Sequence, residues 1–210
     1  GRHQLQQRAV GGQPLGDAAG LLARMMREEV DVRRKLRALW CLYVIGAADE
    51  KLLLGLLESP DEHLRSWGVR LLVDSGNVSP AALSALQELA PKEPSGLVLT
   101  YLASALQKLP PGRLWRLAGS LAAREDFAAD RVLPTMIWYG IEPAVPQDPA
   151  GALACIAGSG MTKVSHYTAR RLAYELETDS ATVGALFTLA AKLSAVQRRA
   201  VLSGISQAFE

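Results

Sequence analysis

Residues 60–72 read PDEHLRSWGVRLL, and this stretch decides the fold. Asp61 stands where the cap residue of a helix is expected, just before a run in which Leu64 and Leu72 recur at helical spacing. Gly68 lies in the middle of that run, in the place where a small residue lets a neighbouring helix come close. The stretch therefore predicts an amphipathic helix that packs tightly, through its glycine, against a second helix.

The same layout recurs along the chain. Ala38 follows Asp31 by seven positions and precedes Leu42 by four, as Gly68 does in the first stretch. Further copies of the small-residue position are placed at Ala103, Ala169 and Gly204, with Ile137 as a poor match. Successive positions lie 30 to 35 residues apart, the length of one helical hairpin. Since a hairpin buries its apolar face only in a stack, we predict an all-α fold, a right-handed α–α superhelix of about six helical hairpins. A compact irregular helical bundle is the alternative.

The composition agrees with a helical fold. The chain of 210 residues has 34 Leu and 32 Ala but only 14 Val, 5 Ile and 7 Thr, which favours helices over strands. The first 16 residues are polar and rich in Gly and Gln, so we expect a partly disordered lead-in at 1–16 and one helical-repeat domain over 17–210. Apolar spacing, cap residues and turn signals predict twelve helices, at about 17–28, 31–46, 49–58, 61–74, 80–90, 95–108, 112–124, 130–139, 149–158, 162–176, 180–192 and 194–208.

The segment 138–149 interrupts this rhythm. It reads WYGIEPAVPQDP, with prolines at 143, 146 and 149 that do not fit a regular helix. We expect an ordered, extended connection that its aromatic side chains hold in place. Pro134, just upstream, is expected to shorten or kink the helix that carries Trp138.

Charge and cysteine content narrow the possible functions. The formal net charge of +2 is too small for a general polyanion binder, and no apolar run has the length of a membrane span. Cys41 and Cys155 are the only cysteines, both in apolar helical contexts that predict buried structural thiols. No CxxC or CxxCH motif occurs, so we expect no zinc, iron–sulfur or covalent haem site and no cofactor.

Several stretches together resemble a known family. They are LWCL at 39–42, PDEHLRSWGVRLL at 60–72, RVLPTMIWYGIEPAVPQDP at 131–149 and ARRL at 169–172. In general these stretches resemble HEAT repeats, which are helical-hairpin arrays with an Asp and an Arg near the start of the second helix. The narrower resemblance is to the HEAT-repeat region of PVC-type haem-binding or putative membrane-bound dehydrogenase proteins, and MIWYGIEP is its most specific element.

The resemblance implies a role without chemistry of its own. In that family a sorbosone/glucose-dehydrogenase-like β-propeller precedes the helical repeats and a cytochrome c module with CxxCH follows, in large exported proteins. It implies that this chain is a non-catalytic spacer or protein-interaction scaffold of a periplasmic redox protein. Its partners would be the flanking domains of the same polypeptide or an acidic protein, and we expect a monomer. A cytosolic adaptor and a nucleic-acid-binding repeat protein of the HEAT-like DNA glycosylase type are the alternatives, the second disfavoured by the small net charge.

Catalytic candidates are few. His63 and His166 each fall early in a predicted helix, where an ordinary surface histidine is expected, and His3 falls in the lead-in. No Ser or Cys stands in a motif that would use them as a base. We therefore expect no enzymatic activity in this chain.

The basic residues and one aromatic pair are the candidate binding residues. In a hairpin array the second helices line one face, and they carry many arginines, including Arg198 and Arg199. The candidates for a basic face that docks an acidic partner are Arg65, Arg70, Arg131, Arg170 and Arg171. The alternative is that neighbouring carboxylates and carbonyls occupy each guanidinium. Trp138 and Tyr139 are the candidates for an exposed aromatic ledge, because the chain turns irregular directly after them.

Overall fold

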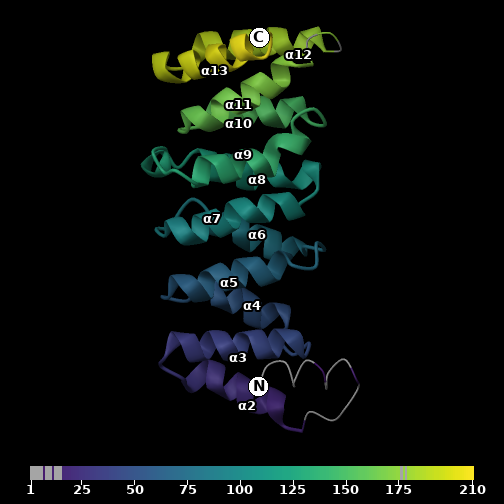
Figure 1. The fold of residues 1–210 in the computed structure, drawn as a ribbon, viewed down its shortest axis with the longest axis vertical. Helices are drawn as coiled ribbons and strands as arrows, with labels where there is room; N and C mark the ends of the chain where they lie inside the picture. Colours follow the sequence, from purple (N-terminus) through teal and green to yellow (C-terminus); the bar gives the residue numbers. More distant parts are fainter. Residues whose placement is uncertain (1–6, 8–10, 12–15, 176, 178) are drawn as a thin grey trace. The chain divides into compact units, whose positions relative to one another are not determined.

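The computed structural model describes residues 7, 11, 16–175, 177 and 179–210, and every regular element in these ranges is a helix (Figure 1). The predicted all-α class is therefore confirmed. The predicted lead-in at 1–16 lies mostly outside the described residues. None of the described helices is both long enough and apolar enough to cross a membrane.

The chain separates into two compact units, unit 1 over residues 1–72 and unit 2 over residues 73–210. Unit 1 contains α2 (Ala18–Glu28), α3 (Val32–Val44), α4 (Glu50–Leu56) and α5 (Glu62–Val73). Helix α5 ends one residue past the boundary between the units. Those of unit 2 are α6 (Pro80–Leu89), α7 (Gly96–Ala105), α8 (Pro111–Ala122), α9 (Leu133–Ile141), α10 (Pro149–Gly158), α11 (Thr162–Ala173), α12 (Ser180–Lys192) and α13 (Ala195–Gln207). Three short 3-10 turns, also in unit 2, are η1 (Leu106–Lys108), η2 (Glu125–Phe127) and η3 (Glu142–Ala144).

The predicted cap residues explain why the helices begin where they do. Asp61 Oδ1 accepts hydrogen bonds from the backbone N–H groups of His63 (2.9 Å) and Leu64 (3.2 Å). Ser79 and Asp148 cap α6 and α10, each directly before a proline at the first helical position. All twelve predicted helices are present, with ends that differ from the prediction by a few residues.

The segment 138–149 differs from the prediction of an extended connection. Helix α9 continues to Ile141, η3 follows directly, and Val145 is still in the helical region of the backbone map. Three prolines are accommodated because each lies in a first turn, where its missing N–H has no intrahelical partner to lose: Pro134 in α9, Pro143 in η3 and Pro149 in α10. Pro146 lies in the turn between η3 and α10. The segment is thus a tight 3-10 connection rather than an extended one.

In unit 1, α2 packs on α3, and the indoles of Trp40 in α3 and Trp67 in α5 meet edge to face at 5.0 Å. Gly68 is buried against α4. A Cβ atom at Gly68 would lie 3.0 Å from Leu56 Cβ and 3.2 Å from the carbonyl oxygen of Leu53. The predicted tight helix–helix approach at Gly68 is therefore present.

We predict that Gly68→Leu lowers the free energy of unfolding of unit 1 by about 1–3 kcal/mol, because the added side chain must push α5 away from α4. Urea unfolding followed by circular dichroism measures this. Gly55→Leu is the matched control, since a Cβ at Gly55 meets nothing within 4 Å. An equal loss of stability in both variants would contradict the packing role of Gly68.

Unit 2 is built from two layers of helices. In one layer α6, α8, α10 and α12 pack in succession, and in the other α7, α9, α11 and α13 do the same (Figure 1). Successive helices also pack across the layers, as α8 does on α9 and α10 on α11. The core at the C-terminal end of the unit includes Ile156, Leu172, Leu186 and Val201, all almost fully buried.

Small residues mark the crossings within the second layer. Ala103, Ala169 and Gly204 are buried as their repeat positions predict. The poor match at Ile137 has a structural reason. Gly140, one helical turn later, makes the close approach in α9, where a Cβ would lie 2.6 Å from Leu106 Cβ.

Candidate functional site

The two cysteines differ in burial. Both are free thiols, and Cys155 is buried in α10 while Cys41 is half-buried in α3. Burial raises the pKa of the Cys155 thiol to about 12, so it stays protonated and unreactive at neutral pH. Among the described residues no three His, Cys, Asp or Glu side chains gather in a way that could hold a metal ion.

The two candidate arginines of unit 1 have local contacts. Arg65 donates from Nη1 to the carbonyl oxygens of Ser59 (2.8 Å) and Pro60 (3.1 Å), which precede its own helix. Arg70 is exposed and places its guanidinium 5.1 Å from the centre of the Trp67 ring. Arg65 thus holds a loop in place, and Arg70 covers an aromatic ring with its charge still exposed.

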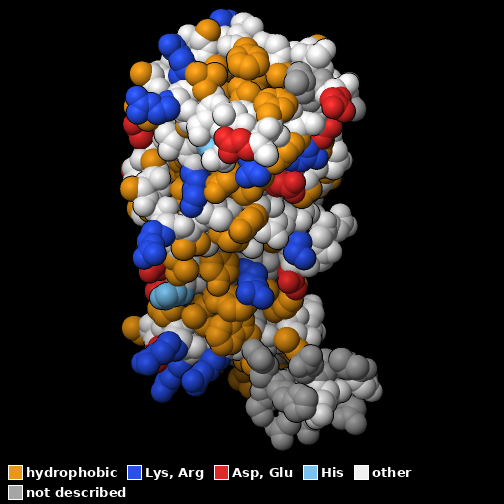
Figure 2. Space-filling view, turned by 45° about the horizontal axis from the view of Figure 1, so that its top comes forward, with side chains coloured by type: hydrophobic (Ala, Val, Ile, Leu, Met, Phe, Trp, Pro, Cys, Tyr) orange, Lys and Arg blue, Asp and Glu red, His pale blue; other side chains and the backbone are white. Residues whose placement is uncertain are grey.

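The three candidate arginines of unit 2 differ in how far their charge is neutralised. Arg171 pairs with Glu175 (2.6 Å) and Glu142 (3.5 Å). Arg170 donates twice to the hydroxyl of Tyr174, at 2.8 and 3.1 Å, which leaves its positive charge uncompensated. Arg131 is exposed and forms no hydrogen bond or ion pair with any described residue. The five arginines are divided between the two units, so a common basic face stays a prediction, and Figure 2 shows Lys and Arg side chains spread among apolar and acidic ones.

The aromatic pair at the end of α9 is split between two environments. Trp138 packs against the core of unit 2 and stacks on Tyr167 of α11, with ring centres 5.6 Å apart and planes 27° apart. Tyr139 is 59% exposed and lines a hollow of about 430 Å³ between η1, α8, α9 and η3. Of these two residues, only Tyr139 is therefore available as an exposed aromatic contact.

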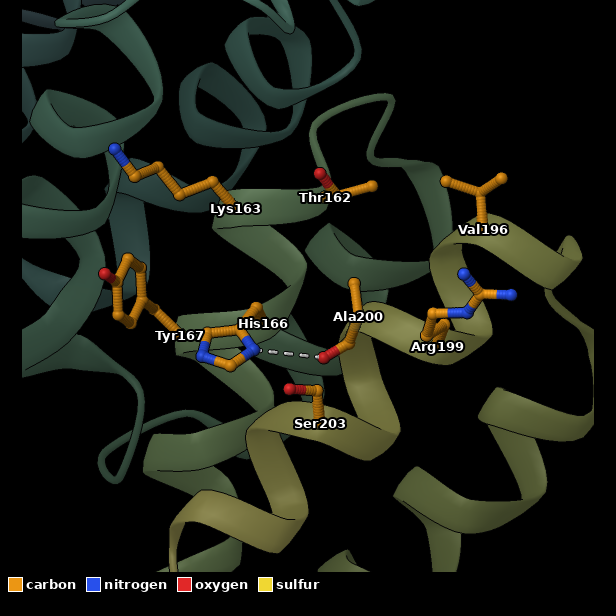
Figure 3. Close-up of a pocket in the computed structure, with 8 residues that line it drawn as sticks. All are labelled: Thr162, Lys163, His166, Tyr167, Val196, Arg199, Ala200 and Ser203. Atoms are coloured by element: carbon orange, nitrogen blue, oxygen red, sulfur yellow. Dashed lines mark hydrogen bonds between the residues drawn. The ribbon is translucent and has the colours of Figure 1, made fainter.

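A shallow groove between α11 and α13 brings together polar side chains from both helices (Figure 3). We call it the α11–α13 groove; it has a volume of about 430 Å³. Four of its lining residues come from each helix: Thr162, Lys163, His166 and Tyr167 from α11, and Val196, Arg199, Ala200 and Ser203 from α13.

The groove exists because Gly204 lets the two helices approach closely. A Cβ at Gly204 would clash with the carbonyl oxygen of His166 and lie 3.1 Å from the backbone nitrogen of Arg170. The His166 ring bridges the helices, with Nδ1 3.3 Å from the carbonyl oxygen of Ala200 and Nε2 3.1 Å from Oε1 of Gln207. These contacts hold the floor and walls of the groove in a defined arrangement.

The charge of the groove is positive. Lys163 and Arg199 line it, no lining residue is acidic, and Arg170 lies one helical turn beyond His166 on α11. In the sequence Lys163 was not a candidate, His166 was interpreted as an ordinary surface histidine, and Arg199 was named among the second-helix arginines but not among those chosen for the basic face. The signal that could have pointed to them is the helical spacing of Lys163 and His166 on α11 together with Arg199 and the small residue Gly204 on α13, but only once α11 is known to pack on α13.

Comparison with known proteins found no matching family model, no matching curated protein and no matching solved structure.

Proposed function

We propose that this chain is a non-catalytic helical-repeat module that positions or binds other protein domains. The observation that supports it most is the two-layer stack of unit 2, in which Gly140 of α9 and Gly204 of α13 allow close contacts with the preceding helix of the same layer and its 3-10 extension. We propose that the hairpins of the chain stack as a HEAT-like right-handed superhelix of about six hairpins, since repeat arrays of this kind recognise partners through extended surfaces.

The family resemblance gives the proposal its context. By that resemblance the module is the spacer between a dehydrogenase-like propeller and a cytochrome c module of an exported, periplasmic redox protein. The MIWYGIEP stretch supports a mechanical role for this element, because Ile137 and Ile141 are fully buried and Trp138 stacks on α11. A rigid joint of this kind keeps flanking domains at a fixed separation.

We expect the chain by itself to be inactive in redox assays. The purified chain is incubated with haem and its visible spectrum recorded, and sugar oxidation is assayed with an artificial electron acceptor. The expected results are no stoichiometric Soret band and no turnover. Either signal would contradict a non-catalytic role.

The scaffold role itself is tested by binding. The resemblance implies a propeller and a cytochrome module as flanking domains; these two modules are expressed separately and mixed with the chain, and size-exclusion chromatography reports co-elution. We expect a complex with at least one of them. The absence of co-elution with either module would overturn the proposed scaffold role in that redox protein.

A further inference from the structure

The α11–α13 groove carries positive charge that the described part of the chain does not neutralise. Lys163 donates from Nζ to the hydroxyl of Thr135 at 2.9 Å, a neutral partner. Arg199 forms no hydrogen bond or ion pair with a described residue, and Arg170 bonds only to the neutral hydroxyl of Tyr174. Arg171 on the same helix shows the contrast, since two carboxylates neutralise it. Three uncompensated cations thus lie in or beside one groove.

The walls of the groove are preorganised for a ligand. Figure 3 shows Lys163 and Arg199 on opposite sides of the groove with His166 between them. The His166 ring is held by contacts to Ala200 and Gln207, and the Tyr167 ring is held by its stacking on Trp138. A ligand that binds here therefore orders few side chains besides the two long cations, which lowers the entropic cost of binding.

We propose that the α11–α13 groove binds an acidic segment of a partner protein, whose carboxylates pair with Arg199, Lys163 and Arg170. This inference rests on the proposed role in binding other proteins, and it adds the chemical class of the partner and the side chains that bind it. Guanidinium groups bind carboxylates through two parallel hydrogen bonds, and the hydroxyl of Ser203, which also lines the groove, adds a donor. Val196, 67% exposed at the rim, offers an apolar contact to the same segment.

Protein carboxylates fit this groove better than nucleic acid does. Tight nucleic-acid binding uses on the order of 6–10 phosphate contacts, more than these three cations provide. Single-stranded nucleic acids also need free aromatic faces for base stacking, whereas the Tyr167 ring stacks on Trp138. A short acidic segment needs only a few carboxylates and one apolar residue.

The test uses the full chain and a fluorescein-labelled peptide of repeating Glu-Glu-Leu, with binding followed by fluorescence anisotropy. We expect binding at low salt that weakens as salt is raised, because exposed charges are screened. The double variant Lys163→Glu/Arg199→Glu should lose affinity by about tenfold or more. Arg116→Glu is the control: it makes one such charge reversal on the exposed surface of α8, outside the groove, and should bind as the unchanged chain does.

The outcomes separate this proposal from the proposed function. Circular dichroism and thermal unfolding of each variant show that the fold is retained. Unchanged peptide binding by the double variant, an equal loss in Arg116→Glu, or tighter binding of a labelled oligothymidylate than of the peptide would each overturn the proposal. Co-elution with the propeller or cytochrome module together with no peptide binding would overturn the groove proposal and leave the scaffold role standing.

Discussion

Replacing Gly204 with leucine is expected to lower the free energy of unfolding of unit 2 by about 3 kcal/mol, at the upper end of what overpacking costs. Even the Cβ of a larger residue would clash with the carbonyl oxygen of His166 and crowd the backbone nitrogen of Arg170. Both are main-chain atoms of α11, so no side-chain rotation relieves the overlap. The helices α11 and α13 must move apart, and the core residues between them lose contact.

Thermal unfolding followed by circular dichroism measures the effect, and Gly184→Leu is the matched control. Gly184 lies in α12, and a Cβ there meets nothing within 4 Å. Because leucine is a better helix former than glycine, this control is expected to raise stability by about 0.5–1 kcal/mol. If Gly204→Leu unfolded at the same temperature as the unchanged chain, the close approach of α11 and α13 would be refuted.

The second large effect is expected at Arg124, in the connection after α8. Its Nη1 donates to the carbonyl oxygens of Ala90 (3.1 Å) and Glu93 (2.7 Å), more than thirty residues away in sequence. The side chain is only 14% exposed and pairs with Asp126 at 2.7 Å. Arg124→Met keeps much of the volume but leaves both carbonyl oxygens without this donor, which is expected to cost about 2–3 kcal/mol.

Urea unfolding checks this, with Arg116→Met as the control because Arg116 is exposed on α8. The hydrogen bond from Arg124 lowers the pKa of the Asp126 carboxyl, so the stabilisation by this pair is present above the ordinary pKa of aspartate. It is lost as the pH falls through the lowered value in the folded protein. The stability difference between Arg124→Met and the unchanged chain should therefore shrink in strong acid, and a difference independent of pH would contradict a contribution from the ion pair.

Local sequence was sufficient to predict the helices. Cap residues such as Asp61 and Ser79 act on backbone groups two or three residues away, and apolar spacing is a property of one helix at a time. The prediction failed at 138–149 because prolines exclude the middle of a helix but suit its first turn, and the sequence alone does not tell which of the two each proline occupies.

The candidate site was only partly visible in the sequence, because it depends on which helices meet. Arginines were named as candidates, but the sequence does not show whether a carboxylate neutralises each guanidinium, because packing brings that partner to it. Glu142 of η3 pairs with Arg171 of α11, whereas Arg199 has no such partner among the described residues. The groove likewise exists only because Gly204 sets α13 against the backbone of α11. The sequence by itself therefore determined the helical elements, their caps and the small residues at repeat spacing, since these are set by short-range backbone chemistry. The tertiary structure decided two further features, because both depend on contacts between residues about thirty positions apart. One is which small residue makes each close helix contact, with Gly140 in place of Ile137, and the other is the positive charge left exposed between α11 and α13.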